Sequence, residues 1–99
     1  MRRFVDEAGN EVRLTDERLR HILQRHPEMA RQLRRIRETL AEPDLIAPSS
    51  ADPDVRLYYR LYPDLQGRRR YICLVVKRMA DYSFIITGYP ARNIRRTQT

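Results

Sequence analysis

The 99-residue sequence has little of several residue types, and each scarcity excludes a class of protein. Its single cysteine, Cys73, cannot form an intramolecular disulfide, and two isolated histidines do not complete a structural zinc site. No apolar run approaches the roughly 18 residues that span a bilayer, and charges near the N-terminus interrupt any signal-peptide core. We therefore expect a cytoplasmic protein that contacts no membrane and needs neither metal nor cofactor.

What remains is the composition of a single, strongly basic domain. A hydrophobic fraction of 41% is too high for a disordered chain, and a charged fraction of 33% is too high for a membrane protein. The length fits one domain over residues 1–99, since typical domains run to about 100 to 150 residues. Twenty basic residues against 13 acidic ones give a net charge of +7, which favours a polyanionic partner, nucleic acid first. Lys77 is the only lysine.

The first half of the chain predicts a hairpin followed by two helices. Arg3–Leu14 reads as two short strands about a Gly9-Asn10 turn. A capping residue and apolar residues at helical spacing then predict a helix over Asp16–Arg25. Proline is favoured at the first position of a helix, so a second helix should begin at Pro27, and Pro43 should stop it.

The second half predicts strands. Asp44–Pro48 is a candidate edge strand, and a polar loop of turn-forming residues follows it. Val55–Tyr62, Tyr71–Arg78 and Ser83–Tyr89 are rich in β-branched and aromatic residues at hairpin spacing, which is typical of an antiparallel meander. We expect a frayed basic tail over Arg92–Thr99.

Alternation of side chains along the three long strands predicts two different faces of the sheet. One face is apolar and should pack against the helices; it holds Leu57, Tyr59, Leu61, Ile72, Leu74, Val76, Phe84, Ile86 and Gly88. The other is cationic and aromatic, with Arg56, Tyr58, Arg60, Tyr62, Tyr71, Cys73, Val75, Lys77, Ile85, Thr87 and Tyr89. Because basic residues bind phosphates and tyrosines stack on bases, this second face is a candidate platform for single-stranded RNA. The alternative is an ordinary sheet face turned to water.

Lys77 and Thr87 are candidate catalytic residues on the cationic face. Lys77 ends an apolar strand, where its ammonium could stabilise a phosphorane-like transition state, or act as a base if neighbouring arginines favour the neutral amine. The alternative is an edge lysine that extends into solvent. Thr87 either binds phosphate through its hydroxyl or is simply a good strand former.

His21 and His26 are the candidate acid–base groups, and helix geometry separates them. His26 falls close to the apolar stripe of the first helix, where it either takes part in catalysis or merely caps and packs before Pro27. His21 points away from that stripe, beside Arg18 and Arg25, whose charges favour the neutral imidazole that a general base requires. The alternative for His21 is a solvated helix residue.

Several short motifs between Leu14 and Ile94 together resemble one group of nucleases. They are Leu14-Thr15-Asp16-Glu17-Arg18-Leu19-Arg20-His21-Ile22, His26-Pro27-Glu28, Glu38-Thr39-Leu40-Ala41-Glu42-Pro43-Asp44-Leu45-Ile46, Arg56-Leu57-Tyr58-Tyr59, Val75-Val76-Lys77 and Thr87-Gly88-Tyr89-Pro90. The set is similar to the small phage and bacterial proteins of the BECR type, a name that covers nucleases resembling barnase, EndoU, tRNA-cleaving colicins and RelE. This resemblance implies an α+β fold, with two N-terminal helices packed on a twisted antiparallel sheet of about four strands. It also implies metal-independent RNA cleavage on the other face of the sheet.

The chemistry that the resemblance implies is attack by a ribose 2′-hydroxyl on the adjacent phosphate, which leaves a 2′,3′-cyclic phosphate and a 5′-hydroxyl. A base, an acid and cationic stabilisation of the phosphate are required. By resemblance, the expected catalytic residues are His21, His26, Lys77 and Thr87. The residues expected to bind RNA are Arg56, Tyr58, Arg60, Tyr62, Tyr89 and Arg92.

The leading hypothesis is a toxin-like or phage-derived endoribonuclease that acts on tRNA or mRNA and has an antitoxin or immunity protein as its partner. Two alternatives use the same fold. One is a module that binds RNA on the cationic face without cutting it, and the other is an interaction domain whose arginines meet an acidic protein. RNA affinity that falls steeply with salt would favour the first alternative over the second, since phosphate contacts release counterions.

Overall fold

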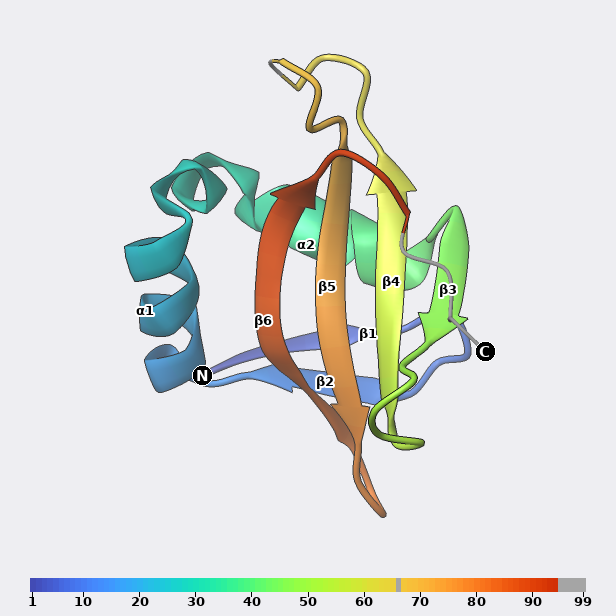
Figure 1. The fold of residues 1–99 in the computed structure, drawn as a ribbon. Coiled ribbons are helices and arrows are strands. Elements are labelled where there is room, and N and C mark those ends of the chain that lie inside the picture. Colours follow the sequence, from blue (N-terminus) through green and yellow to red (C-terminus); the bar gives the residue numbers. More distant parts are fainter. Residues whose placement is uncertain (66, 95–99) are drawn as a thin grey trace.

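The chain builds one mixed β-sheet with helices packed against it (Figure 1). The computed structural model describes residues 1–65 and 67–94. The strands are β1 (Arg2–Val5), β2 (Glu11–Leu14), β3 (Leu45–Pro48), β4 (Val55–Leu61), β5 (Tyr71–Arg78) and β6 (Ser83–Ala91). The helices are α1 (Asp16–Arg25), the 3₁₀ helix η1 (Pro27–Gln32) and α2 (Leu33–Ala41). The predicted α+β class is confirmed.

Six strands form the sheet, in the order β1-β2-β6-β5-β4-β3. Neighbouring strands are antiparallel except β2 and β6, which run parallel, with Val12 opposite Ser83 and Arg13 opposite Phe84. The expected sheet of about four antiparallel strands is therefore too small, and it misses the parallel pair. The N-terminal hairpin joins the sheet through β6, and no local sequence pattern encodes such a contact between distant parts of the chain.

The N-terminal hairpin is confirmed, and its turn has a clear physical cause. The Asp6 carboxylate accepts hydrogen bonds from the N–H groups of Ala8 and Asn10, each at 2.9 Å. Gly9 has a φ of 84°, a conformation that costs a glycine little and other residues more. Local hydrogen bonding and one glycine thus set the register of β1 against β2.

The helical region begins as predicted and then departs from the prediction. The Thr15 hydroxyl accepts a hydrogen bond from the Arg18 N–H at 3.1 Å, so α1 has the expected N-cap. Pro27 begins a new helix, but this helix is η1, and α2 starts only after Gln32, whose φ of −114° leaves the helical range. The single second helix expected between Pro27 and Pro43 is therefore two helices of different type.

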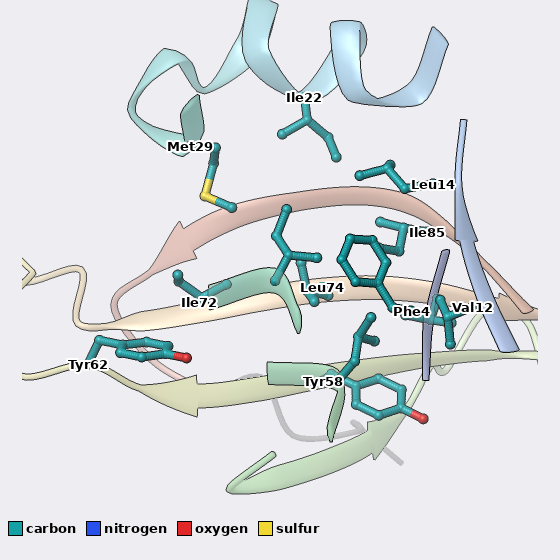
Figure 2. Close-up of a cluster of buried hydrophobic side chains, with 13 residues drawn as sticks. Phe4, Val12, Leu14, Ile22, Met29, Tyr58, Tyr62, Ile72, Leu74 and Ile85 are labelled. Atoms are coloured by element: carbon teal, nitrogen blue, oxygen red, sulfur yellow. The ribbon is translucent and has the colours of Figure 1, made fainter. Parts of the chain in front are cut away.

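The main core lies between the helices and one face of the sheet (Figure 2). Ile22 of α1 and Met29 of η1 point toward the strands, where Ile72, Leu74 and Ile85 meet them. The other buried members of this core are Phe4, Val12, Leu14, Ile36, Leu40, Tyr58, Tyr62 and Val76. We call this side of the sheet the helix face.

The predicted faces of β4 are reversed in the structure. Tyr58 lies opposite Leu74 of the helix face, whereas Tyr59 lies opposite Cys73, which belongs to a separate cluster on the other side of the sheet. Arg56, Tyr58 and Arg60 therefore do not share a face with Lys77. Apolar and aromatic residues occur in both parities of β4, so alternation alone could not decide which parity is buried.

The predicted faces of β6 are also partly wrong, because of an irregularity in pairing. The register shifts between Val75 and Val76, so that Val75 lies opposite Thr87 and Val76 opposite Ile85. A β-bulge of this kind adds one residue to a strand and reverses its alternation beyond that point. Ile85 thus enters the core, although alternation predicted Phe84 and Ile86 there. Gly88 remains on the helix face as predicted, close to Leu74.

We call the side of the sheet opposite the helices the open face. Its buried residues are Ala47, Tyr59 and Cys73, and partly buried residues packed around them include Val75, Tyr89 and Ile94. The chain after β6 crosses in front of β5 on this side (Figure 1). The predicted basic tail begins here, but residues 95–99 lie outside the described residues. In the described part of the chain, no helix has the length and apolar character needed to cross a bilayer.

Candidate active site

Two of the predicted catalytic residues, Lys77 and His26, lie at different ends of the β5–β6 strand pair. Lys77 is near the end of β5, whereas His26 contacts Tyr89 of β6, which lies opposite Cys73. Cys73 and Lys77 are separated along β5 by about 13 Å, at about 3.3 Å per residue. The structure therefore does not bring Lys77 and His26 together. We call these two places the Lys77 end and the His26 end.

At the Lys77 end, the ammonium group is bound to a carboxylate. Lys77 Nζ lies 3.1 Å from Asp52 Oδ2, and both side chains are about one-third exposed. Asp52 also accepts a hydrogen bond from the Asp54 N–H at 2.8 Å, in the loop before β4. That backbone bond, and then the bond from Lys77, lower the pKa of Asp52. The charge of Lys77 is thus balanced within the protein and holds this loop to β5.

At the His26 end, chain geometry places an imidazole against a tyrosine. His26 ends α1, because its N–H donates to the Ile22 carbonyl at 2.7 Å and the following proline cannot continue the helix. The rings of His26 and Tyr89 have centroids 5.7 Å apart and are tilted by 34°. The side chain of His26 is 28% exposed, so a ligand can still reach it.

Glu28 adds a carboxylate to the His26 end. Its Oε1 lies 3.6 Å from His26 Nδ1. Pro27 gives the turn that directs both side chains to the same place, since it begins η1 immediately after His26. We did not select Glu28 from the sequence as a functional residue, although it stands in the His26-Pro27-Glu28 motif and that spacing was a signal for it.

Thr87 and Tyr89 extend the His26 end along β6. They lie opposite Val75 and Cys73 respectively, so both belong to the open face. Both side chains are partly exposed. An imidazole in contact with a carboxylate and a phenol therefore forms the His26 end, and the Thr87 hydroxyl lies two residues further along the same face of β6. These side chains include both proton-transfer groups and hydrogen-bonding groups.

Of the three tyrosines expected to bind RNA, only Tyr89 is on this surface. Tyr58 is fully buried, and its hydroxyl donates to Glu7 at 2.8 Å. Tyr62 is 7% exposed and donates to Glu38 at 2.7 Å. Burial, and then the bond to Glu38, raise the pKa of Tyr62 to about 12, and burial also raises the pKa of Tyr58. Their rings belong to the helix-face core.

The arginines expected beside those tyrosines also belong to the helix face. Arg56 lies 5.6 Å from the centre of the Tyr58 ring, and Arg60 lies 5.6 Å from that of Tyr62. Arg60 also donates a hydrogen bond to the carbonyl of Glu42, at the end of α2. These contacts explain why charged residues alternate with tyrosines in β4 without forming an RNA platform together with Lys77.

The remaining predicted residues occupy peripheral places. His21 is partly exposed on α1, about 1.4 turns before His26. Arg92 is exposed and directly follows β6. Within residues 1–65 and 67–94, no group of three or more histidine, cysteine, aspartate or glutamate side chains could hold a metal ion.

Comparison with known proteins agrees with the resemblance seen in the sequence. The model of a family described as phage-Barnase-EndoU-ColicinE5/D-RelE like nuclease2 matches residues 1–99. Neither a search of curated proteins nor a search of solved structures gave a match. The family match includes the N-terminal hairpin and all six strands of the sheet. The chain therefore belongs to the phage-Barnase-EndoU-ColicinE5/D-RelE like nuclease2 family.

Proposed function

We propose that the protein is an endoribonuclease that cleaves RNA by transesterification without a metal ion, and that its catalytic centre is the His26 end. Membership of a nuclease family supports phosphodiester cleavage. The observation that carries the location is the grouping of His26, Glu28 and Tyr89, with 3.6 Å between His26 Nδ1 and Glu28 Oε1 and 5.7 Å between the rings of His26 and Tyr89.

The reaction needs one proton acceptor and one proton donor. Glu28 accepts the proton of the ribose 2′-hydroxyl as the 2′-oxygen forms a bond to phosphorus. His26 donates a proton to the 5′-oxygen as the bond between phosphorus and that oxygen breaks. The products are a 2′,3′-cyclic phosphate and a 5′-hydroxyl. The hydroxyl groups of Thr87 and Tyr89 lie along the same stretch of β6 and orient the phosphate.

The Lys77 end is the alternative location for the same transesterification. A lysine can stabilise a phosphorane-like transition state, but here its charge is balanced by Asp52 at 3.1 Å. A phosphate at Lys77 would therefore compete with that carboxylate for the same charge. We therefore assign Lys77 to the anchoring of the loop before β4 and place the reacting phosphate at the His26 end.

The net positive charge of the protein supports a proposal for its substrate and for its protein partner. A net charge of +7 attracts RNA, and we propose tRNA or mRNA as the substrate. A toxin-like role would require an inhibitor, and an acidic antitoxin or immunity protein would complement the same charge.

The experiment is cleavage of tRNA and total RNA by the purified protein in EDTA, with mapping of the product ends. We expect cyclic phosphate ends in the products of the wild type. Cleavage should stop at a bond whose upstream ribose is 2′-deoxy, since that nucleotide has no attacking hydroxyl. His26→Ala should bind RNA normally and cleave it at least 100-fold more slowly. RNA that binds but remains intact at several pH values would contradict the nuclease proposal and favour a binding module.

A further inference from the structure

A pocket of about 480 Å³ opens next to the His26 end. It lies between η1, the loop that joins β4 to β5, and the ends of β5 and β6. Glu28 is part of its wall and also lies 3.6 Å from His26, so the pocket adjoins the proposed catalytic centre through this carboxylate. Pro90 and Ile72 lie opposite each other on the helix face, so the pocket is on that side of the sheet, whereas Tyr89 is on the open face. Its volume falls in the range of about 300 to 1,000 Å³ that is usual for small-molecule sites.

Two arginines and two carboxylates line this pocket, and the arginines are its candidate anion-binding groups. Arg31 of η1 and Arg69 of the β4–β5 loop both line it, and both are exposed. Neither one forms an ion pair with another residue in the described ranges. Each guanidinium can therefore bind an anion without first breaking an ion pair, unlike Lys77 at the other end of β5.

The carboxylates of the pocket already have cationic or imidazole neighbours. Asp64 accepts a hydrogen bond from Arg35 Nη2 at 2.6 Å, and this bond lowers the pKa of Asp64. Glu28 lies 3.6 Å from His26. Asp64 is thus already paired with Arg35, and neither acid forms an ion pair with Arg31 or Arg69, so both guanidinium groups are available to an anionic ligand.

The two arginines come from different elements, and local structure holds each of them. In a 3₁₀ helix, residues three apart lie above one another, so Arg31 stands on the same side of η1 as Glu28. The loop that carries Arg69 is closed by a hydrogen bond from the Tyr62 N–H to the Arg70 carbonyl at 2.7 Å. The Arg35–Asp64 pair also ties this loop to α2.

The rest of the pocket suits the uncharged part of a nucleotide. Leu65 and Pro90 provide apolar surface over the buried Ile72, and Gln32 provides one amide that can both donate and accept hydrogen bonds. A simple anion would use the arginines alone, whereas a nucleotide would also use the apolar surface and the amide.

We propose that this pocket binds the nucleotide next to the cleaved phosphodiester, with Arg31 and Arg69 on its phosphate and its base against the apolar surface. The inference rests on the proposed function, because it places the neighbouring phosphate in the catalytic centre. Guanidinium groups bind phosphate oxygens in pairs of parallel hydrogen bonds, which fixes the position of the RNA backbone as well as adding affinity. The pocket would thereby set the distance between the bound nucleotide and Glu28.

The test is the binding of a ribonucleoside 3′,5′-bisphosphate, which carries two phosphates one nucleoside apart and cannot be cleaved by this reaction. Affinities are measured by calorimetry for the full chain and for Arg31→Ala and Arg69→Ala. Arg20→Ala is the matched control, since Arg20 is an exposed arginine at the rim of a different pocket, on α1. We expect each pocket variant to weaken binding at least fivefold and the control to change it less than twofold.

Inorganic pyrophosphate is the control ligand, because it carries two phosphates but no nucleoside. We expect it to bind at least fivefold more weakly than the bisphosphate. Equal affinities for the two ligands would overturn the nucleotide site and leave only an anion site. Equal losses in Arg20→Ala and in the pocket variants would overturn the location. Thermal melting of each variant checks that the fold is intact.

The inference and the proposed function can fail separately. If His26→Ala abolishes cleavage while the pocket variants bind the bisphosphate as the wild type does, the protein is a ribonuclease and the pocket proposal is wrong. If the pocket variants lose binding but the wild type never cleaves RNA, the pocket is a nucleotide site and the nuclease proposal is wrong.

Discussion

The Lys77 end and the His26 end of the β5–β6 strand pair both carry a basic side chain, yet their surroundings differ. At the Lys77 end, the ammonium is 3.1 Å from a carboxylate, and the pair holds a loop. At the His26 end, an imidazole and a carboxylate lie beside a pocket whose two arginines form no ion pair with other described residues. The type of a basic residue therefore does not determine its role. A side chain whose charge is balanced by a carboxylate, such as Lys77, can anchor a loop, whereas an arginine without an ion pair is available to an anionic ligand.

The largest expected effect is at Glu28. Glu28→Gln keeps the shape of the side chain but removes the proton acceptor, so we expect RNA cleavage to fall about 100-fold while RNA binding changes little. The measurement is the cleavage rate of an end-labelled RNA under single-turnover conditions. Glu42→Gln is the matched control, since Glu42 is an exposed glutamate just after α2. Equal rates in Glu28→Gln and in the wild type would remove Glu28 from the catalytic centre.

A smaller effect is expected from Gly88, which precedes Tyr89 on β6 and lies opposite Leu74. A Cβ at residue 88 would lie 2.8 Å from Leu74 Cδ2 and 3.9 Å from Met29 Cε. Leu74 and Met29 are fully buried, so they have little room to move, and Gly88→Ala should lower the free energy of unfolding by about 1–2 kcal/mol. Urea denaturation measures this change.

Gly88→Ala should also affect the His26 end and the Lys77 end differently. Leu74 would have to move to make room for the methyl group, and it packs in the same core as Met29 of η1, the helix that carries Glu28 and Arg31, so we expect slower cleavage in the folded protein as well. The Lys77–Asp52 pair should be undisturbed. An unchanged unfolding free energy together with unchanged cleavage would show that Leu74 accommodates the methyl group without moving η1.

The smallest expected effect is a pH dependence of stability at the Lys77 end. The pKa of Asp52 is lowered in the folded protein, first by the Asp54 N–H and then by Lys77. This contribution to stability is therefore present above the unfolded pKa of about 4 and is lost as the pH falls through the lower, folded pKa. Thermal melting between pH 5 and pH 2 should show a smaller loss for Asp52→Asn than for the wild type. An identical loss in both proteins would mean that neither the Asp54 N–H nor Lys77 lowers the pKa of Asp52 in the folded protein.

Much of the fold could be predicted from the sequence, because its signals are local. The bounds of α1 follow from Thr15 and from the proline after His26, and β5 follows from a continuous run of strand-forming residues. The faces of β4 could not be predicted, since both parities are apolar or aromatic and the arginines there extend over tyrosine rings. The bulge at Val75/Val76 and the parallel pairing of β2 with β6 depend on contacts that alternation does not encode.

The candidate site was less predictable than the fold. His26 and Glu28 are close in sequence, so their meeting was within reach of sequence reasoning. The approach of Tyr89 to His26, and that of Asp52 to Lys77, join distant segments and needed the tertiary structure. Tyr58 and Tyr62 have the residue type of an RNA-stacking surface, but they serve the core.

The central claim, that cleavage occurs at the His26 end, is tested most directly by comparing His26→Ala with Lys77→Ala. Both are assayed on the same RNA in EDTA, with RNA binding and thermal melting measured in parallel. We predict that His26→Ala lowers the cleavage rate at least 100-fold, as expected on loss of an acid–base group, and that Lys77→Ala stays within about threefold of the wild type. The opposite result, with cleavage lost in Lys77→Ala and retained in His26→Ala, would contradict the account and place the catalytic centre at the Lys77 end.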